Sequence, residues 1–424
     1  MPGDKSISHR AAMIAGMAHG TSTIENFSTS ADCAATLACL IALGLLIERE
    51  GTALAINGVG FDGLREPPAP LDCGNSGTTM RLLAGILAGQ DFKSTLTGDD
   101  SLRSRPMRRI IEPLQLMGAT ISSGDGRAPL VIQGHRALNA ITYELPVASA
   151  QVKSGILLAG LSAAGRTEVV ENHTTRDHTE RMLRSFGVHV ETGETEGGKA
   201  RFAAVNGPAR LTATQISIPG DVSSAAYFIA AAALLPGSSL EISEVGVNPT
   251  RSLFLKQLRA SGLDIEVTNA REHNNELVGV IRVHGSRRQL SGKSDFPMTV
   301  SGLMVPRLID ELPLLAVVGS QIEGGIEIRD AAELRFKESD RIATTAQNLR
   351  AMGAQVEEFA DGLRVAGRGE LHGAQIDPHG DHRIAMAFTV AGLLAQGETE
   401  ITDSACVAVS FPEFFELLDA VVER

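Results

Sequence analysis

Cationic side chains recur in short polar segments that precede or begin apolar stretches of the chain. These cations are Lys5, Arg10, Arg81, Arg103, Arg105, Lys153, Arg176, Lys337, Arg341 and Arg383. The first amide groups of a helix lack intrahelical partners and favour a negative charge, so cations placed there add to an anion-binding site. For a single segment, a capped helix with solvated cations is the commoner explanation. Because the pattern recurs, we expect several helix starts to gather around anionic ligands.

Acidic residues near the same positions could move protons. Asp310 and Glu311 open an apolar stretch, and residues 337–341 place two acids between two cations. An acid in a first turn usually serves only as a cap. Among cations that gather around a substrate, a carboxylate within reach of a transferable proton can act as an acid or a base. On these local grounds we favour Asp310 over Glu311.

Other kinds of site are not indicated by the sequence. His9, His178 and His382 lie in similar turns, but no two histidines share a helix at metal-ligand spacing, so we expect no metal. The four cysteines have no CxxC spacing, which argues against a zinc site or a disulfide framework. Residues 74–79 resemble a phosphate cradle but lack the Gly-Lys-Ser/Thr ending of a nucleotide-binding loop.

The composition is that of a globular protein. The chain has 424 residues, of which 43% are hydrophobic and 21% charged, and its formal net charge is -12. With this charge, no Trp and two Tyr, it does not have the basic, aromatic surface expected for nucleic-acid binding. The longest apolar runs, 37–47 and 225–235, fall short of the roughly 20 residues of a membrane span. We therefore expect a cytoplasmic protein that binds neither nucleic acid nor membrane.

One module recurs six times along the chain. Each copy begins with a polar segment and an apolar helix of small residues, and the copies start near residues 2, 72, 148, 219, 309 and 380. A glycine follows each helix, as expected where the chain turns left-handed: Gly20, Gly89, Gly165, Gly237, Gly324 and Gly397. A β-branched strand, a charged helix and two short strands come next. The modules predict an α/β chain of two three-module domains, with the apolar helices buried and their N-terminal ends gathered around anions.

Ten motifs in order resemble the 5-enolpyruvylshikimate-3-phosphate synthase family, in the bacterial subgroup that carries PGDKSISHR. They are PGDKSISHR, GNSGTTMRLLAG, SLRSRPM, ASAQVKSGILLAGL, TRDHTERML, PGDVSSAAYF, NPTR, IDELPLLAV, ELRFKESDRI and GDHRIAMAF. The resemblance implies the two-domain enolpyruvyl transferase fold, with three βαβαββ units per domain around buried parallel helices and an active site in the inter-domain cleft. It implies that residues 5–218 form the domain on the shikimate 3-phosphate side. Residues 1–4 plus 219–424 would form the domain with the catalytic acids and the phosphoenolpyruvate site.

The resemblance also implies a reaction. The enolpyruvyl (carboxyvinyl) group of phosphoenolpyruvate would be transferred to the 5-hydroxyl of shikimate 3-phosphate, with release of phosphate, through a tetrahedral intermediate. This reaction belongs to the shikimate pathway to chorismate and the aromatic amino acids. The resemblance implies no metal and no organic cofactor, and we expect a monomer whose partners are the two small-molecule substrates.

The same motifs imply roles for individual residues. Asp310 would take the hydroxyl proton and Glu338 would protonate the methylene carbon, while Lys5 and Lys337 would stabilise the intermediate. Lys5 could instead share the role of base with Asp310. The residues implied to hold shikimate 3-phosphate are Ser6, Arg10, Ser149, Ala150, Gln151 and Arg176, with Ser149 and Arg176 nearest its phosphate. Those implied to hold phosphoenolpyruvate are Lys5, Gly77, Arg105, Arg341 and Arg383, and Asp310 and Lys337 also contact substrate.

Two alternative functions compete with this one. An enolpyruvyl transferase for UDP-N-acetylglucosamine shares the fold, but it uses an Asn where this chain has Ser6 and a loop cysteine that no cysteine here matches. A non-catalytic anion-binding relative would be expected to avoid acids such as Asp310 and Glu338 beside bound phosphate. One departure from the resemblance is Val409, where the other subgroup carries a lysine, so one phosphoenolpyruvate contact is absent or supplied elsewhere.

Overall fold

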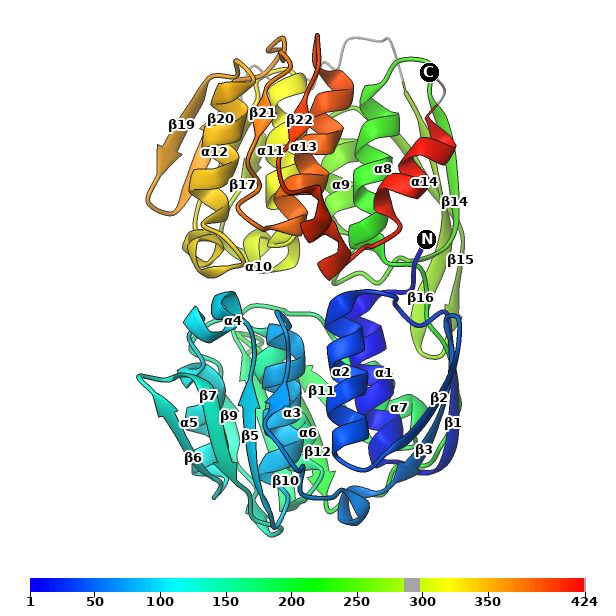
Figure 1. The fold of residues 1–424 in the computed structure, drawn as a ribbon, viewed down its shortest axis with the longest axis vertical. Helices are drawn as coiled ribbons and strands as arrows, with labels where there is room; N and C mark the ends of the chain where they lie inside the picture. The colour runs from blue at the N-terminus through cyan, green and yellow to red at the C-terminus, as the bar shows by residue number, and fades with distance from the viewer. Residues whose placement is uncertain (286–297, 423–424) are drawn as a thin grey trace. The chain divides into compact units, whose positions relative to one another are not determined.

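The computed structural model describes residues 1–285 and 298–422, which form two compact units (Figure 1). We call them the N-terminal unit, made of Gly3–Pro219 and Glu272–Glu276, and the C-terminal unit, made of Met1–Pro2, Gly220–Arg271 and Leu277–Arg424. The sequence does not predict that residues 272–276 belong to the N-terminal unit. Among the described residues, no helix is both long and apolar enough to cross a membrane.

The N-terminal unit contains three successive modules. The first comprises α1 (Lys5–Met17), β1 (His19–Glu25), α2 (Ala31–Ala42), β2 (Leu46–Glu50), β3 (Ala53–Val59) and the 3-10 helix η1 (Phe61–Gly63). The second comprises β4 (Leu71–Asp72), α3 (Gly77–Ala88), β5 (Lys93–Thr97), α4 (Asp100–Ser104), α5 (Arg108–Leu116), β6 (Thr120–Gly124) and β7 (Arg127–Gln133). The third comprises β8 (Leu138–Asn139), β9 (Thr142–Glu144), α6 (Ala150–Gly160), β10 (Ala163–Glu171), α7 (His178–Ser185), β11 (Val190–Glu194) and β12 (Arg201–Gly207), and β13 (Gln215–Ser217) ends the unit.

The C-terminal unit repeats the plan. Its first module comprises α8 (Val222–Leu234), β14 (Ser239–Gly246), α9 (Leu253–Ala260), β15 (Asp264–His273) and β16 (Glu276–His284). The second comprises β17 (Met298–Val300), η2 (Gly302–Met304), α10 (Val305–Leu308), α11 (Leu312–Gln321), β18 (Ile326–Ile328), η3 (Ala332–Phe336), α12 (Arg341–Ala351), β19 (Val356–Phe359) and β20 (Gly362–Val365). The third comprises β21 (Gln375–Ile376), α13 (His382–Leu394), β22 (Glu400–Ile401), η4 (Ser404–Val409) and α14 (Phe414–Val421).

Each module builds a small sheet, and β13 adds a strand to the sheet of the first module. The strand orders are β13-β1-β3-β2, β4-β5-β7-β6 and β11-β12-β10-β8, with β9 also paired to β10, in the N-terminal unit, and β14-β16-β15, β17-β18-β20-β19 and β21-β22 in the C-terminal unit. Parallel pairs such as β4 with β5 and β21 with β22 need a crossover, which the buried helix between them supplies. The predicted α/β fold of repeated modules in two domains is therefore confirmed. The sixth module departs from the plan, because η4 and α14 follow β22 within residues 400–422.

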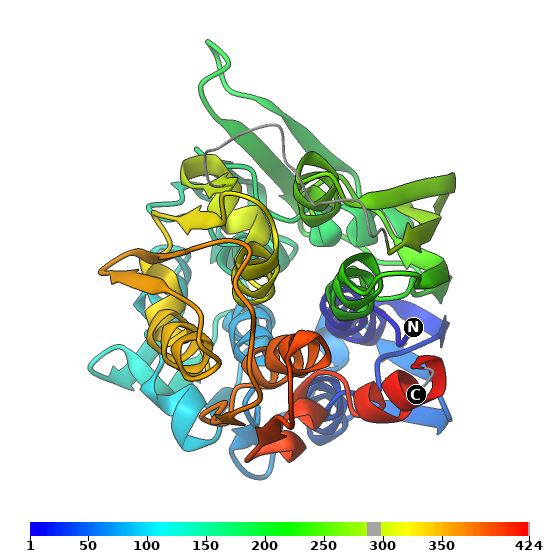
Figure 2. The same ribbon diagram turned by 90° about the horizontal axis from the view of Figure 1, so that it is seen from above.

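The apolar helices lie inside their units. All 13 residues of α8 are buried, as are 11 of the 13 in α1 and 9 of the 13 in α13. A helix that is apolar on every side loses its contact with water only if sheets or helices surround it. Figure 2 looks nearly along the axes of α8 (green) and α13 (orange-red), which run roughly parallel. The prediction of buried parallel helices is confirmed for these elements.

The glycines that follow these helices do not all turn left-handed. Gly237 does, with φ of 84°, and it leads from α8 into β14. Gly89 does not: it caps α3 with φ of -89°, so the expectation of a left-handed residue is wrong at this position. There α3 ends with its last amides bonded to Ile86 and Leu87, a geometry that any residue type can adopt.

Glycine has a different role where α3 meets α6. A Cβ atom at Gly85 would lie 2.1 Å from the carbonyl oxygen of Gly155, so the two helix backbones touch at this point. This approach is possible only without a side chain on α3. Because α3 and α6 each begin at a candidate ligand-binding segment, their spacing also fixes the distance between those segments.

Replacing Gly85 by Ala should destabilise the protein. Overpacking of this kind costs about 1–3 kcal/mol, which exceeds the gain of roughly 0.5–1 kcal/mol from replacing a helical glycine by alanine. We expect a melting temperature several degrees lower by calorimetry. Gly124→Ala is the matched control, because a Cβ there meets nothing within 4 Å. Equal melting temperatures for the two variants would contradict the packing described here.

Candidate active site

The buried helices α8 and α11 of the C-terminal unit begin at one polar cluster. Arg251 donates a hydrogen bond to Ser223 in the first turn of α8, and Ser223 in turn is bonded to Glu311, the residue before α11. Arg251 also lies 3.8 Å from Asp221, the N-cap of α8. Carboxylates at these positions oppose the positive charge of the arginine and of the helix ends.

Arg341 is the most deeply buried cation in this part of the unit. It is the first residue of α12, and its Nε lies 2.7 Å from Asp381 Oδ2 and its Nη2 2.6 Å from Glu338 Oε2. Burial lowers the pKa of Arg341, but the charges of Asp381 and Glu338 outweigh it and raise the pKa above its usual range. Nη1 makes no hydrogen bond within the described residues and lies 3.6 Å from Asp310 Oδ1. This N–H group can therefore donate to an oxygen of a bound anion.

Arg383 brings a second guanidinium to Asp310. Its Nε lies 3.7 Å from Asp310 Oδ1, and its Nη1 donates to the Asp310 carbonyl at 3.4 Å. Burial lowers the pKa of Arg383, whereas Asp310, Tyr227 and Glu311 raise it well above its usual range. The Asp310 side chain keeps 18% of its surface exposed. A carboxylate between two fixed cations, open to solvent on one side, can accept a proton from a bound group.

Asp381 bonds the guanidinium of Arg341 and the backbone amide of Arg383, a role that the sequence does not predict. It is the fully buried N-cap of α13, and it accepts hydrogen bonds from Arg341 Nε, from the Arg383 amide at 2.9 Å and from Ser339 Oγ at 3.2 Å. The signal in the sequence is an aspartate directly before His382 and Arg383, at a capping position. A capping aspartate is common, so only its contacts reveal that it also orients Arg341.

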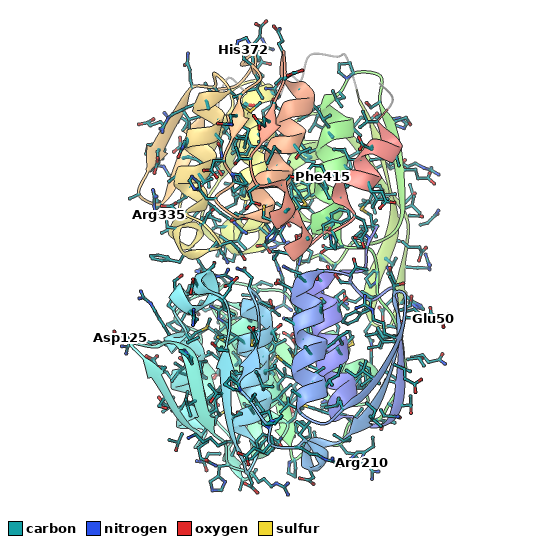
Figure 3. All side chains as sticks on the ribbon, in the orientation of Figure 1. Glu50, Asp125, Arg210, Arg335, His372 and Phe415 are labelled. Carbon is teal, nitrogen blue, oxygen red and sulfur yellow. The ribbon has the colours of Figure 1, made fainter. Side chains whose placement is uncertain are left out.

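Lys337 lies at the edge of this arrangement. Its Nζ is 3.5 Å from Glu333 Oε1, four residues earlier. Arg335, labelled in Figure 3, lies 2.7 Å from Asp340, the N-cap of α12. The described contacts thus bring together Asp310, Glu338, Arg341 and Arg383, and they place Lys337 beside Glu333.

In the N-terminal unit, α1 begins with Lys5. Asp4 caps this helix by accepting a hydrogen bond from the Ile7 amide at 2.9 Å. Lys5 Nζ lies 2.9 Å from Asp32 Oδ2, a partner on α2 that the sequence does not predict. The lysine is therefore held in one position by a carboxylate while part of its side chain stays exposed.

Arg10 is buried and bonded to neutral groups. Nε donates to Thr179 Oγ1 at 2.7 Å, Nη2 to Ser154 Oγ at 2.9 Å and Nη1 to the Ser6 carbonyl at 2.8 Å. Burial lowers the pKa of Arg10 to about 10, and the charge of Arg176 contributes to the decrease. Arg10 thus braces α1 against α6 and α7, and its positive charge lies near that of Arg176.

The starts of α3 and α6 also meet. Gln151 Nε2 donates to Thr78 Oγ1 at 2.8 Å, and Gln151 Oε1 accepts from Arg81 Nη1 at 2.7 Å. A Cβ at Gly77 would lie 2.6 Å from Arg81 Nη1, so a larger residue there would shift the end of this flexible side chain. Ser149 caps α6 by accepting from the Val152 amide at 3.4 Å, next to Ala150. Amides, a hydroxyl and an arginine are therefore concentrated at this end of the unit, which suits an anion.

Arg105 follows α4 as its C-cap and is buried. Its Nη2 donates to Asn75 Oδ1 at 2.7 Å and to Ser101 Oγ at 3.0 Å, and its Nη1 donates to the Asn75 carbonyl. The glycine-rich segment 74–79 thus orients the guanidinium directly. The sequence predicts an anion ligand at Arg105 but not these supporting contacts.

Lys153 does not behave as an anion-binding cation. Its side chain is 2% exposed, and Nζ lies 2.7 Å from Glu180 Oε1 and 3.2 Å from Glu171. Glu171 also accepts from the Thr175 hydroxyl at 2.6 Å. Arg176 lies in the segment between β10 and α7. Lys153, on α6, pairs with one glutamate at each end of this segment and so holds both ends against α6.

His9 is bonded to one hydroxyl at the end of a chain of hydroxyl groups. Its Nδ1 lies 2.7 Å from Thr36 Oγ1, which lies 2.7 Å from Thr79 Oγ1, and Thr79 donates to Ser76. Burial, with smaller contributions from Lys5 and Arg10, lowers the pKa of His9 well below its ordinary value of 6.5. Within the described residues, no group of three or more His, Cys, Asp or Glu side chains is arranged to hold a metal ion.

Comparison with known proteins identifies relatives of the whole chain. The family described as EPSP synthase (3-phosphoshikimate 1-carboxyvinyltransferase) matches residues 1–418. A 3-phosphoshikimate 1-carboxyvinyltransferase from Geobacter sp. (strain M21) is 50% identical over 426 residues, covering 100% of this chain and 96% of that protein. One from Koribacter versatilis (strain Ellin345) is 51% identical over 424 residues, with the same coverage. A solved EPSP synthase structure from Acinetobacter baumannii is 43% identical with a TM-score of 0.85, covering 99% of this chain and 94% of that one.

The fold and the relatives define a two-domain transferase of the enolpyruvyl type. The chain belongs to the EPSP synthase family. It transfers the enolpyruvyl group of phosphoenolpyruvate to shikimate 3-phosphate in the shikimate pathway, as the motif resemblance predicts. The alternatives of a UDP-N-acetylglucosamine enolpyruvyl transferase and of a non-catalytic relative are not favoured by these findings.

His9 should make the stability of the protein depend on pH. Because the pKa of His9 is lower in the folded than in the unfolded state, the unfolded state binds more protons below about pH 6.5. The free energy of unfolding should therefore fall as the pH decreases below that value, by up to about 1.4 kcal/mol per pH unit from this residue. His9→Gln should flatten this slope in denaturant titrations between pH 5 and 7, whereas the exposed His189→Gln should not. An unchanged slope for His9→Gln would contradict the conclusion that folding lowers the pKa of His9.

Proposed function

We propose that Asp310 and Glu338 perform the two proton transfers of this reaction. The observation that carries the proposal is their shared guanidinium, since Arg341 lies 3.6 Å from Asp310 and 2.6 Å from Glu338. Two carboxylates that one buried cation holds near each other can act on two atoms of the same substrate pair. Asp310 acts as the base, and Glu338 acts first as an acid and then as a base.

In the first step, the 5-hydroxyl oxygen of shikimate 3-phosphate attacks C2 of phosphoenolpyruvate. Asp310 accepts the hydroxyl proton, and Glu338 in its acid form donates a proton to C3, which becomes a methyl group. An anionic substrate that binds Arg341 competes with Glu338 for this guanidinium and adds negative charge nearby, which favours the protonated form of Glu338. The product is a tetrahedral intermediate that carries the phosphate on C2.

In the second step, the intermediate loses phosphate. The Glu338 carboxylate takes a proton from the methyl group, the electron pair forms the C2–C3 double bond, and the C2–O bond to phosphate breaks. Asp310 returns its proton to the departing phosphate, so both carboxyl groups recover their starting states. Lys5 and Lys337 stabilise the negative charge of the intermediate. Lys5 sharing the role of base remains the alternative.

We assign phosphoenolpyruvate to the arginine-rich set. Its ligands are Lys5, Gly77, Arg105, Arg341 and Arg383. Guanidinium groups suit its carboxylate and phosphate because they form bidentate hydrogen bonds. The unbonded Nη1 of Arg341 supports this assignment, and so does the orientation of Arg105 by Asn75.

We assign shikimate 3-phosphate to the hydroxyl- and amide-rich set. Its ligands are Ser6, Arg10, Ser149, Ala150, Gln151 and Arg176, and Asp310 and Lys337 also contact substrate. The N-terminus of α6 supports this assignment, since helix amides favour phosphate. Arg10 contributes mainly through its charge and by fixing the Ser6 carbonyl.

The proposal extends to the setting of the reaction. Both sets of residues act on one pair of substrates, with residues 5–218 supplying most shikimate 3-phosphate ligands and residues 219–424 supplying the acids. The protein is cytoplasmic and monomeric, with its two small-molecule substrates as partners. Phosphorylated substrates, whose charges oppose passage through a lipid bilayer, support the cytoplasmic location. Sedimentation at micromolar concentration tests the monomer, and a concentration-dependent dimer would overturn it.

Asp310→Asn and Glu338→Gln should slow turnover. Loss of one general acid or base lowers kcat by about 10²–10⁴-fold. The Michaelis constants should change by less than about 10-fold, because the arginines that bind the anions remain. Phosphate release from phosphoenolpyruvate in the presence of shikimate 3-phosphate measures both quantities.

Glu370→Gln is the control for these variants, since Glu370 is exposed and lies outside the cluster. It should turn over at the wild-type rate. A wild-type kcat in either Asp310→Asn or Glu338→Gln would remove that residue from the mechanism.

A further inference from the structure

The tip of the β15–β16 hairpin belongs to a different unit from its stem. The strands β15 and β16 lie mainly in the C-terminal unit, whereas the five residues 272–276 are part of the N-terminal unit. At the turn, Asn274 and Asn275 both have positive φ, at 47° and 61°. Consecutive left-handed residues make a tight two-residue turn, for which asparagine is among the favoured types.

The tip is bonded to α7 at three points. Glu276 is 4% exposed, and its Oε1 lies 2.7 Å from Nδ1 of His178, the first residue of α7. Arg181 donates to the Asn275 carbonyl at 2.6 Å and to Asp177 at 2.8 Å. One turn later, Ser185 Oγ donates to the Asn274 carbonyl at 3.2 Å. The whole length of α7 is thus held against the tip.

The same turn is bonded to β13. The Asn274 side chain accepts from the Ser217 amide and donates to the Gln215 carbonyl, both at 3.0 Å. The side-chain amide of Asn274 therefore pairs with both a backbone N–H and a backbone C=O group of β13, at the edge of the first sheet. The tip thereby connects α7 to β13, two elements of the N-terminal unit that are separated by more than 25 residues of chain.

Helix α7 carries contacts that reach the proposed shikimate 3-phosphate ligands. Thr179 accepts from Arg10 at 2.7 Å, and Glu180 lies 2.7 Å from Lys153. Arg176 lies two residues before the helix. Moving the start of α7 would therefore displace Arg176 and loosen the contacts of Arg10 at the same time.

We propose that Glu276, acting through His178, is a positioning residue for the shikimate 3-phosphate site, and that the hairpin tip 272–276 fixes the start of α7. The inference rests on the proposed function, because it takes Arg176 and Arg10 as ligands of that substrate. Glu276 itself touches no substrate in this account. Its effect is to hold the first turn of α7, and with it Arg176, in the geometry that binds phosphate.

The test measures binding of shikimate 3-phosphate alone, by titration calorimetry without phosphoenolpyruvate. Glu276→Ala should weaken this binding by about 10-fold or more, because the buried His178 loses its partner. Glu276→Gln keeps an acceptor for His178 and should bind within about 3-fold of wild type. Glu272→Ala, at an exposed position of the same tip, is the control and should bind normally. In steady state, the KM for phosphoenolpyruvate should stay unchanged in all three variants.

A second variant covers the case in which Glu276→Ala does not fold. Asn274→Gly retains the left-handed turn and removes the side-chain bonds to Gln215 and Ser217, so it should also weaken shikimate 3-phosphate binding. If Glu276→Ala folds and binds shikimate 3-phosphate with wild-type affinity, the inference is overturned and the proposed function stays intact. If Glu276→Ala does not fold, wild-type affinity of Asn274→Gly has the same meaning. Failure of the wild-type protein to bind shikimate 3-phosphate would instead overturn the assignment of the ligands.

Discussion

Carboxylates hold Arg341 and Arg383 in the first turns of α12 and α13, and the candidate site depends on this balance of charge. Arg341 is nearly inaccessible to water, yet Asp381 and Glu338 raise its pKa above the usual range. An arginine buried without such partners would be costly, since breaking a buried ion pair destabilises a protein by about 3–5 kcal/mol. The acids therefore keep the guanidinium charged where no solvent stabilises it. A bound anion meets a cation that is already oriented.

The N-terminal unit holds its cations by different means. Arg10 donates to two hydroxyls and a carbonyl, and burial lowers its pKa to about 10, which still leaves it charged at neutral pH. Lys5 Nζ lies 2.9 Å from the Asp32 carboxylate. Hydroxyl and carbonyl groups therefore orient Arg10, whereas carboxylates orient Arg341.

Much of the fold and part of the candidate site could be predicted from the sequence, and there are physical reasons why the remaining features could not. Repetition of an apolar helix after a polar start predicts the modules and the clustering of helix ends, because helices without a polar face must be buried. The pairing of a cation with its acid depends on contacts across the fold. Asp381 and Asp32 therefore appear in the sequence only as a cap and a helical acid. The partners of Lys153 could not be predicted for the same reason, since Glu171 and Glu180 are 18 and 27 residues away along the chain. Residues 272–276 could not be placed at all, because a hairpin pattern does not identify what its tip will contact.

The most direct test of the mechanism follows a proton at C3 of the enolpyruvyl group. In D2O, protonation of the methylene by Glu338 and later loss of one hydrogen from the methyl group should leave deuterium in the vinyl position of the product. Nuclear magnetic resonance of product formed by the wild-type protein should detect this deuterium. Under single-turnover conditions, Glu338→Gln should form the intermediate and its deuterated methyl group far more slowly, while both substrates still bind. Product free of deuterium from the wild type, or incorporation at the wild-type rate by Glu338→Gln, would contradict the account.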